Sequence, residues 1–271
     1  MALATASQAR PRGPGRDAEG APERTSERVT GPITGPITGP ITGLVTGHDP
    51  ALGQMARMCG EPDSDPSIVL SACASLLSTP GLPPRDQAGA LNNRGLALEK
   101  QGKPDQALAE YDTAIRVWPD AVSARLNRGS LMRRRGDLDG ALREYAAVLD
   151  RDPMNPMALN NRCYARALAG QSLDLALADC DASLRLSHND PRALDSRGFV
   201  RLKRGEDDAA LADFNAVLHA DAGSAHALYG RGLAELRLGR TPEGEADIRD
   251  ALSQRPDVAA DYNRAGLKPQ P

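Results

Sequence analysis

An arginine followed by a small residue recurs through this chain at a nearly constant interval. The five copies are Arg94-Gly95, Arg128-Gly129, Arg162-Cys163, Arg197-Gly198 and Arg231-Gly232, and the steps between them are 34, 34, 35 and 34 residues. A period of this size is typical of helical repeat arrays, in which each unit buries its apolar face against its neighbours. The spacing therefore predicts a fold built by stacking short units, without a single globular core.

Three further sets of positions recur with the same period and outline two helices in each unit. A glycine closes the first helix, where a residue free to adopt a positive φ is needed. A small residue follows near the start of the second helix, and a larger residue comes four positions later. The glycines are Gly102, Gly136, Gly170, Gly205 and Gly239; the small residues are Ala107, Ala141, Ala176, Ala210 and Gly244; the larger residues are Tyr111, Tyr145, Cys180, Phe214 and Ile248. These positions let the two helices of a unit approach closely.

This pattern resembles the tetratricopeptide repeat family and is similar to the arrays of its alphaproteobacterial members. The residues that carry the resemblance in the first unit are Gly95, Ala107, Tyr111, Ala114 and Pro119. The resemblance extends over about residues 65–266. It implies an all-α fold: a right-handed superhelical solenoid of antiparallel helix pairs, with about five tetratricopeptide repeats and capping helices. The third repeat departs most from the pattern, because Cys163 replaces glycine and the closing proline is lost.

The sequence divides into an arm, a series of repeats and two caps. We expect a disordered arm with Gly-Pro-Ile-Thr repeats over residues 1–50, an N-terminal capping helix region over 51–86, five repeats over 87–121, 122–155, 156–190, 191–224 and 225–258, and a C-terminal cap and tail over 259–271. The arm has too few bulky apolar residues to offset the entropy of ordering. Asp65 and Pro66 are expected to start a single helix ahead of the repeats, and Asp257 to cap a short final helix with a polar outer face.

The composition argues against several classes of partner. The formal net charge is −3 and aromatic residues make up 3%, whereas nucleic-acid binding usually needs a clustered basic face or stacking aromatic side chains. There is no run of about 18 apolar residues, so no transmembrane segment is predicted. The start of the chain lacks the apolar region of a secretory signal. This favours a cytoplasmic protein, with a periplasmic or exported protein as the alternative if the cysteines pair.

No catalytic or metal-binding pattern is visible in the sequence. A nucleophile with a neighbouring base, a glycine-rich phosphate loop and a pair of acidic residues are all missing. The four histidines, His48, His188, His219 and His226, are expected to form no cluster with carboxylates or thiols. Without such a cluster no metal site is predicted. We therefore expect a protein that is not an enzyme and that needs no cofactor.

The four cysteines form two local pairs along the chain. Cys163 and Cys180 replace two residues that face each other across the closest helix contact of the third repeat, and Cys59 and Cys73 lie fourteen residues apart around the first helix. Both pairs are possible disulfides, as in exported proteins. The alternative is that all four are buried free thiols, which pack as small apolar groups.

The family resemblance implies a concave groove lined by the first helix of each repeat. Asn93, Asn127 and Asn161 each precede the recurrent arginine. Asparagine is disfavoured inside helices, so three in register need an explanation. An amide can donate to and accept from a peptide backbone, which makes these residues candidate peptide contacts. The alternative is that they bond to adjacent helices and hold the repeats in register.

Other positions on the first helices leave similar alternatives open. Tyr164, Phe199 and Leu233 are candidate apolar anchors for a peptide, or they pack one repeat on the next. The recurrent arginines either pair with carboxylates on the preceding second helix or form a charged ladder for an acidic ligand.

The predicted function is protein–protein interaction, as an adaptor or scaffold that captures a peptide segment in the groove. One alternative is a structural or self-associating protein; another is a non-catalytic accessory subunit of a cell-envelope enzyme complex. Family members that clamp the C-terminal tails of chaperones need five defined side chains. The corresponding residues here are Asn92, Leu96, Asn127, Met157 and Asn161, and only Asn127 fits. A carboxylate-clamp co-chaperone is therefore not expected.

Overall fold

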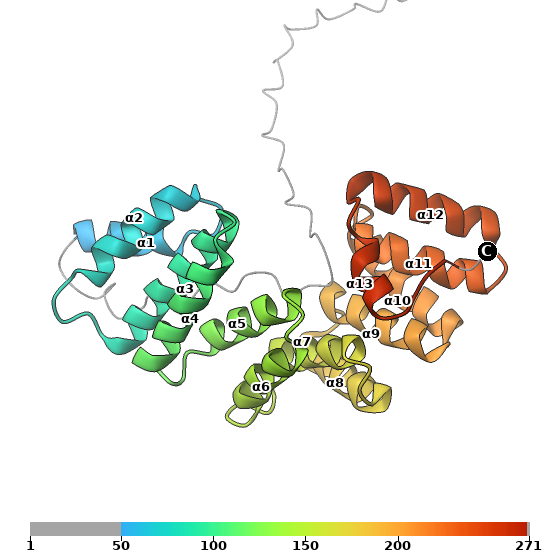
Figure 1. Cartoon of the computed structure of the whole chain (residues 1–271), viewed down its shortest axis with the longest axis horizontal. Helices are drawn as coiled ribbons and strands as arrows, with labels where there is room; N and C mark the ends of the chain where they lie inside the picture. Colours follow the sequence, from blue (N-terminus) through green and yellow to red (C-terminus); the bar gives the residue numbers. More distant parts are fainter. Residues whose placement is uncertain (1–49, 270–271) are drawn as a thin grey trace, which may run out of the picture.

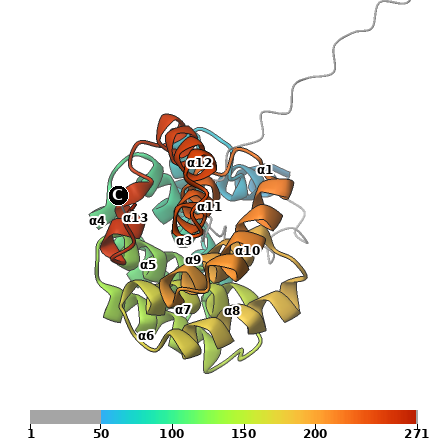
Figure 2. The same cartoon turned by 90° about the vertical axis from the view of Figure 1, so that its right-hand side faces the viewer.

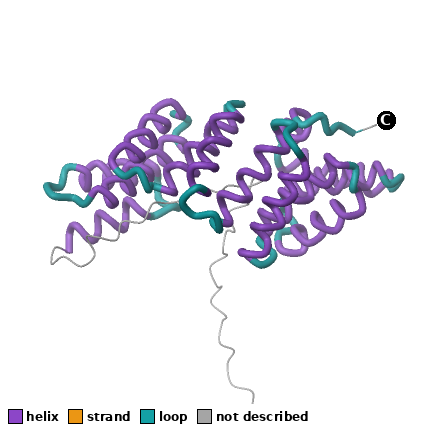
Figure 3. Tube along the Cα trace, turned by 90° about the horizontal axis from the view of Figure 1, so that it is seen from below, coloured by secondary structure: helices purple, strands orange, loops and turns teal. Residues whose placement is uncertain are grey.

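A computed structural model describes residues 50–269 of the chain. Within this range all regular structure is helical (Figure 3), which confirms the predicted all-α class. The thirteen helices of the described range are α1 (Pro50–Gly60), α2 (Pro66–Leu77), α3 (Pro84–Lys100), α4 (Pro104–Val117), α5 (Val122–Arg134), α6 (Leu138–Leu149), α7 (Pro156–Leu168), α8 (Leu173–Ser187), α9 (Pro191–Arg204), α10 (Asp207–Ala220), α11 (Ala225–Arg237), α12 (Thr241–Gln254) and α13 (Ala259–Arg264). The predicted arm and its Gly-Pro-Ile-Thr repeats lie outside the described residues, except that Pro50 already begins α1.

The helices from α3 to α12 form five consecutive antiparallel pairs that stack into a superhelical arc (Figure 1). Viewed along the long axis of the arc, the first helices α3, α9 and α11 lie near the centre, and the second helices α6, α8 and α10 lie at the rim (Figure 2). The inner surface of the arc is therefore built from the first helix of each pair. No helix in the described range combines the length and the apolar character needed to span a bilayer.

The junctions between the paired helices follow the predicted glycines. All five closing glycines, from Gly102 to Gly239, have a positive φ between 66° and 88°. The connection after α8, where the closing proline is missing, behaves differently. There His188 and Asn189 adopt positive φ values of 28° and 59°, which non-glycine residues seldom do. The backbone of the third repeat therefore differs from that of the other repeats in this loop.

In the first, second and fourth repeats, the close contact between the paired helices is an aromatic ring packed on a glycine. A Cβ atom placed on Gly95 would lie 2.5 Å from Cε1 of Tyr111, and one placed on Gly198 would lie 2.9 Å from Cε1 of Phe214. Both distances are shorter than real Cβ contacts. The rings of Tyr111 and Phe214 are fully buried, so the glycine is needed to make room for them.

In the third repeat a disulfide occupies the place of this ring contact. Cys163 and Cys180 are bonded to each other and join α7 to α8. A second disulfide, Cys59–Cys73, joins α1 to α2. All four cysteines are buried, and each bond ties together a helix pair that lacks the ring-on-glycine contact.

The recurrent arginines pair with carboxylates, but their main partner is on a different helix from the one predicted. The shared partner lies sixteen or seventeen residues later, on the second helix of the same repeat. These pairs are Arg94–Glu110, Arg128–Glu144, Arg162–Asp179, Arg197–Asp213 and Arg231–Asp247, at 2.5–2.8 Å. The expected contact with the preceding second helix is made in addition by Arg128 to Asp112 and by Arg197 to Asp181. These two arginines bridge two consecutive second helices.

Both caps differ from the sequence prediction. Two helices, α1 and α2, precede the first repeat where one was expected. Helix α1 is short, contains Gly53 and Gly60 and buries only Ala56 and Cys59, so its sequence gives little sign of a helix. At the other end, Asp257 does not cap α13, which starts after Val258 without a side-chain cap.

We predict that Gly95→Ala destabilises the protein by about 1–3 kcal/mol, because the added methyl overlaps the buried Tyr111 ring. Alanine is otherwise the better helix former by about 0.5–1 kcal/mol. Gly53→Ala is the matched control, since its added Cβ meets only Arg57 Nη1 at 3.7 Å. Urea unfolding measures both; equal stability of the two variants would contradict the close-contact argument.

We predict that Arg197→Ala lowers the unfolding free energy by about 2–4 kcal/mol, because the buried Asp213 then keeps only Arg201 as a partner. The control is Arg249→Ala, whose exposed pair with Glu245 at 3.7 Å should contribute about 0.5 kcal/mol or less. Thermal and urea unfolding of both variants make the comparison, and similar losses in the two would show that the buried pair has no special role.

Candidate functional site

The inner surface of the arc has two parts of different chemistry. The first, here called the amide patch, consists of Asn92, Asn93, Asn127, Asn160 and Asn161 on α3, α5 and α7. The second, here called the aromatic cluster, consists of Tyr164, Phe199, His226, Tyr229 and Tyr262 on α7, α9, α11 and α13. The two parts meet on α7, where Tyr164 follows Asn161 by three residues and therefore lies on the same side of the helix.

Hydrogen bonds connect the amides of the first two repeats. Asn127 Nδ2 donates to Asn92 Oδ1 at 2.8 Å, and Asn92 Nδ2 donates to Asn93 Oδ1 at 3.1 Å. The first bond links α5 to α3, so Asn127 has the inter-helix contact that the structural alternative requires. All three side chains are buried. Asn161 is also buried, and its side-chain nitrogen has no hydrogen-bond partner among the described residues.

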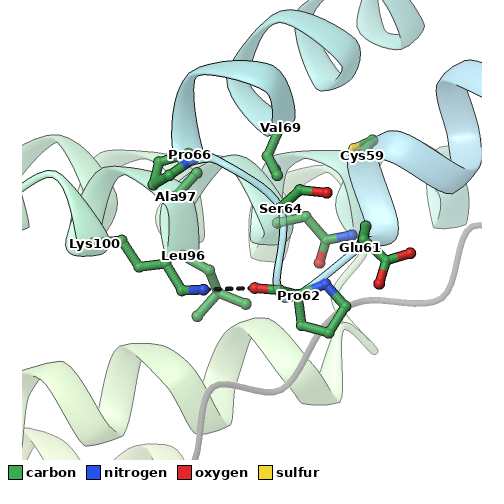
Figure 4. Close-up of a pocket in the computed structure, with 10 residues that line it drawn as sticks. Cys59, Glu61, Pro62, Ser64, Pro66, Val69, Leu96, Ala97 and Lys100 are labelled. Carbon is green, nitrogen blue, oxygen red and sulfur yellow. Dashed lines mark hydrogen bonds between the residues drawn. The ribbon is translucent and has the colours of Figure 1, made fainter. Parts of the chain in front are cut away.

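Asn93 also lines a small pocket between α3 and the connection that follows α1. Figure 4 shows this connection lying over α3, with Lys100 donating a hydrogen bond to the carbonyl of Pro62. The walls include Cys59, Val69 and Leu96, and the cavity measures about 30 Å³. A space of that size holds about one water molecule. This pocket is too small for a peptide side chain of any length.

A larger cavity of about 200 Å³ lies beside the amide patch, between α3 and the start of α5. Its lining combines Arg85, Asn92, Trp118 and Ser123 with several alanines and a glycine. It contains the chain's one tryptophan and both charged and amide groups. A cavity of this volume has room for one apolar side chain, while the amide of Asn92 is already bonded to Asn127 and Asn93.

The aromatic cluster is closed by a side chain from the C-terminal cap. The ring centroids of Tyr164 and Phe199 are 4.8 Å apart, and the ring of Tyr262 lies 5.1 Å from Phe199, 4.5 Å from His226 and 5.0 Å from Tyr229. These spacings are those of packed aromatic pairs. Tyr164 and Phe199 are buried, and so is Leu233 in the same core. All three predicted anchors therefore lie in or beside this cluster.

A hydrogen-bonded histidine and carboxylate lie at the centre of the cluster and correct the prediction about histidines. His226 Nδ1 is 2.8 Å from a carboxylate oxygen of Asp195, and both side chains are buried. The hydroxyl of Tyr262 donates to the His226 carbonyl at 3.0 Å and lies 3.1 Å from Nδ1. His226 does form a cluster with a carboxylate. The residues are 31 positions apart, on the first helices of consecutive repeats, so only the stacking brings them together.

Burial controls the ionisation of the tyrosines in this cluster. Desolvation raises the pKa of Tyr164 and of Tyr262 well above the ordinary value, so both hydroxyls stay neutral donors. Tyr164 Oη and His226 Nε2 have no hydrogen-bond partner among the described residues. The guanidinium of Arg133 stands 5.1 Å from the Tyr164 ring centroid, a cation–π contact that connects α5 to the cluster.

Asp261, next to Tyr262 on α13, interacts electrostatically with positively charged groups around the cluster. Burial acts to raise its pKa, but the charges of His226, Arg133 and Arg264 hold that pKa below the ordinary value of 3.8. An acidic side chain is therefore favoured at this edge of the cluster. In the part of the chain that the structure describes, no three His, Cys, Asp or Glu side chains are grouped to hold a metal ion.

Comparison with family models gives one match. A model described as tetratricopeptide repeat matches residues 92–156, 133–191 and 198–266, which together span more than half of the chain. No curated protein matches the sequence.

Solved structures share the fold over most of the arc. A tetratricopeptide repeat protein from Parabacteroides merdae is 20% identical with a TM-score of 0.60, over 81% of this chain and 91% of that chain. The thermophilic protein TTC0263 from Thermus thermophilus is 22% identical with a TM-score of 0.53, over 64% and 96%. The APC/C hetero-tetramer Cut9–Hcn1 is 16% identical with a TM-score of 0.62, over 74% and 39%. At these identities the likeness establishes the fold alone.

Proposed function

The chain belongs to the tetratricopeptide repeat family, and from that premise we propose that it captures a peptide segment of a partner protein along the inner face of its arc, as an adaptor or scaffold. Repeats of this family generally mediate protein–protein interactions. The observation that carries the proposal is the continuity of the inner face, on which the amide patch leads directly into the aromatic cluster at Tyr164. Such a surface offers both backbone hydrogen bonds and apolar anchoring.

The amide patch supplies the contacts that do not depend on peptide sequence. Asn93, Asn127 and Asn161 are the candidate residues. The side-chain nitrogen of Asn161 has no hydrogen-bond partner among the described residues but is buried, so a peptide gains this donor only when neighbouring side chains move aside. The cavity beside Asn92 and Trp118 then provides a place for one apolar side chain of the peptide. Tyr262 covers the wall formed by Tyr164, Phe199 and Leu233. A peptide can therefore reach these three residues only where Tyr262 does not cover them.

The two alternatives, self-association and service as an accessory subunit of a cell-envelope enzyme complex, gain no specific support. Self-association through an apolar face needs a contiguous patch. The large apolar side chains exposed in the described range are Met58, Ile68, Met154, Leu175 and Leu252, which stand singly on different helices or loops.

The two disulfides bear on where the protein works. Disulfide bonds form and persist in oxidising compartments and are rare in the cytosol. The pairs Cys59–Cys73 and Cys163–Cys180 therefore support the periplasmic or exported alternative. The Cys163–Cys180 bond also stands where the first, second and fourth repeats have a ring packed on a glycine.

The groove is tested by selecting peptides from a random display library on the immobilised full chain and measuring their dissociation constants for variants. We expect Asn161→Ala to weaken binding about ten-fold, the effect of losing one good hydrogen bond in a desolvated contact. Asn127→Ala should weaken it similarly and also lose about 1 kcal/mol of stability with the bond to Asn92.

The matched control for the groove is Arg143→Ala, because Arg143 is exposed on α6 at the rim of the arc. Helicity and melting temperature show that each variant is folded. If the selected peptides bind all three folded variants as tightly as the unaltered chain, the amide patch is not the binding surface and the asparagines are structural.

Protein purified from its native host tests the disulfides. We expect intact mass to rise by about 4 Da on reduction, two for each bond, and the reduced protein to lose about 3 kcal/mol per broken bond for loops of this length. Cys163→Ala paired with Cys180→Ala isolates the second bond. Unchanged mass on reduction would show free thiols and would favour the cytoplasm.

A further inference from the structure

The short helix α13 inserts one side chain into the inner face of the arc. Figure 1 shows α13 beside α9 and α11, on the inner side of the arc. Tyr262 is fully buried there, against Phe199 and Tyr229 as well as His226. These partners come from two consecutive first helices, the same helices that line the rest of the groove. The position is thus that of a bound ligand on the concave surface.

The array is shaped to receive this side chain. In the fifth repeat Gly230 stands at the position held by Asn93, Asn127 and Asn161 in the first three. A Cβ atom placed on Gly230 would overlap the hydroxyl oxygen of Tyr262 and the ring of Phe214. Tyr262 therefore fills the space that an asparagine would take in an earlier repeat. Its hydroxyl donates to the His226 carbonyl at 3.0 Å.

Three buried side chains attach α13 and its flanks to the array, and Tyr262 is the one that α13 itself contributes. The helix has six residues and no side-chain cap. Its flanks add the buried apolar side chains of Val258 and Leu267, whereas the hydrogen-bonded pair Arg264–Asp261 is internal to α13. A six-residue helix has little stability of its own, so the docked form depends on these contacts.

The fit is also incomplete. Tyr164 Oη and His226 Nε2 are buried beside Tyr262 and remain without a hydrogen-bond partner among the described residues. A buried polar group without a partner destabilises the state that contains it. A ligand that accepts a hydrogen bond from Tyr164 Oη and bonds to His226 Nε2 would form two hydrogen bonds that α13 does not form.

We propose that the aromatic cluster is a binding site for a tyrosine-bearing segment of a partner protein, and that α13 is an intramolecular occupant which such a segment displaces. This inference rests on the proposed function, because it assigns the kind of residue that the C-terminal half of the groove recognises. The recognised segment carries a tyrosine preceded by an acidic residue, as Asp261 precedes Tyr262. In α13 this acidic residue, Asp261, pairs with Arg264, and the charges of His226 and Arg133 also help to hold its pKa below the ordinary value.

The test uses the chain's own sequence as the probe. A fluorescent synthetic peptide of residues 256–269 is titrated into three full-length chains: the unaltered chain, Tyr262→Ala and the control Asn263→Ala. Asn263 is exposed on the same helix, so its replacement leaves the site occupied. We expect Tyr262→Ala to bind the peptide about ten-fold or more tightly than the other two chains, which corresponds to the removal of one aromatic competitor.

Two controls define the site. A peptide carrying Tyr262→Ala should bind none of the chains, and Phe199→Ala introduced into the Tyr262→Ala chain should abolish binding. Circular dichroism shows whether the variants remain helical. A folded Tyr262→Ala chain that binds the peptide no better than the unaltered chain would overturn the proposal.

Amide hydrogen exchange provides a second test, which needs no variant. In the unaltered chain, an excess of the peptide should speed amide exchange in residues 258–267 while α11 stays protected; unchanged exchange in residues 258–267 overturns displacement. The peptide copies the chain's own residues 256–269, which occupy the aromatic cluster, so neither the binding result nor the exchange result depends on the amide patch. Failure here with binding of selected peptides intact would remove α13 from the mechanism and leave the proposed function standing.

Discussion

The array depends on the ion pair that the recurrent arginine of each repeat forms with a carboxylate on the second helix. Its carboxylate partner is largely removed from water, as the 3% exposure of Asp213 shows, and a buried charge is tolerated only when it is paired. The pair fixes the angle between the two helices of one repeat. Where the arginine also reaches the preceding second helix, as Arg128 and Arg197 do, it fixes the step to the previous repeat as well. The curvature that results decides which side chains meet on the inner face.

The third repeat shows what happens when the packing rule is broken. A residue larger than glycine next to the arginine leaves no room for the ring that follows in the first, second and fourth repeats. In the third repeat the glycine position and the ring position are both cysteine. Cys163 and Cys180 fill the space between the helices and join them covalently. Arg162 keeps its bidentate contact with Asp179. Packing and charge pairing are thus separable, and the loss of one did not remove the other.

Features that repeat with the period could be predicted from the sequence, and features that depend on its curvature could not. The closing glycines, the helix pairs and the cysteine pairs follow from spacing along one or two helices. The contact of Asp195 with His226 joins residues from consecutive repeats at unequal positions, so no fixed interval marks it. The docking of Tyr262 depends on the same geometry. The partner of each recurrent arginine does have a signal in the sequence, because an acidic residue recurs sixteen or seventeen positions later.

The change along the inner face determines how a bound segment would couple to α13. The asparagine position becomes Ser196 and then Gly230 in the last two repeats, so amide contacts end where the aromatic cluster begins. A segment that stops at α7 can use the amide patch while α13 stays docked. A longer segment meets Tyr262, and the free energy of undocking α13 is then subtracted from its affinity. Selectivity between short and long segments therefore follows from the position of one tyrosine, because only a segment that replaces its contacts gains by extending past α7.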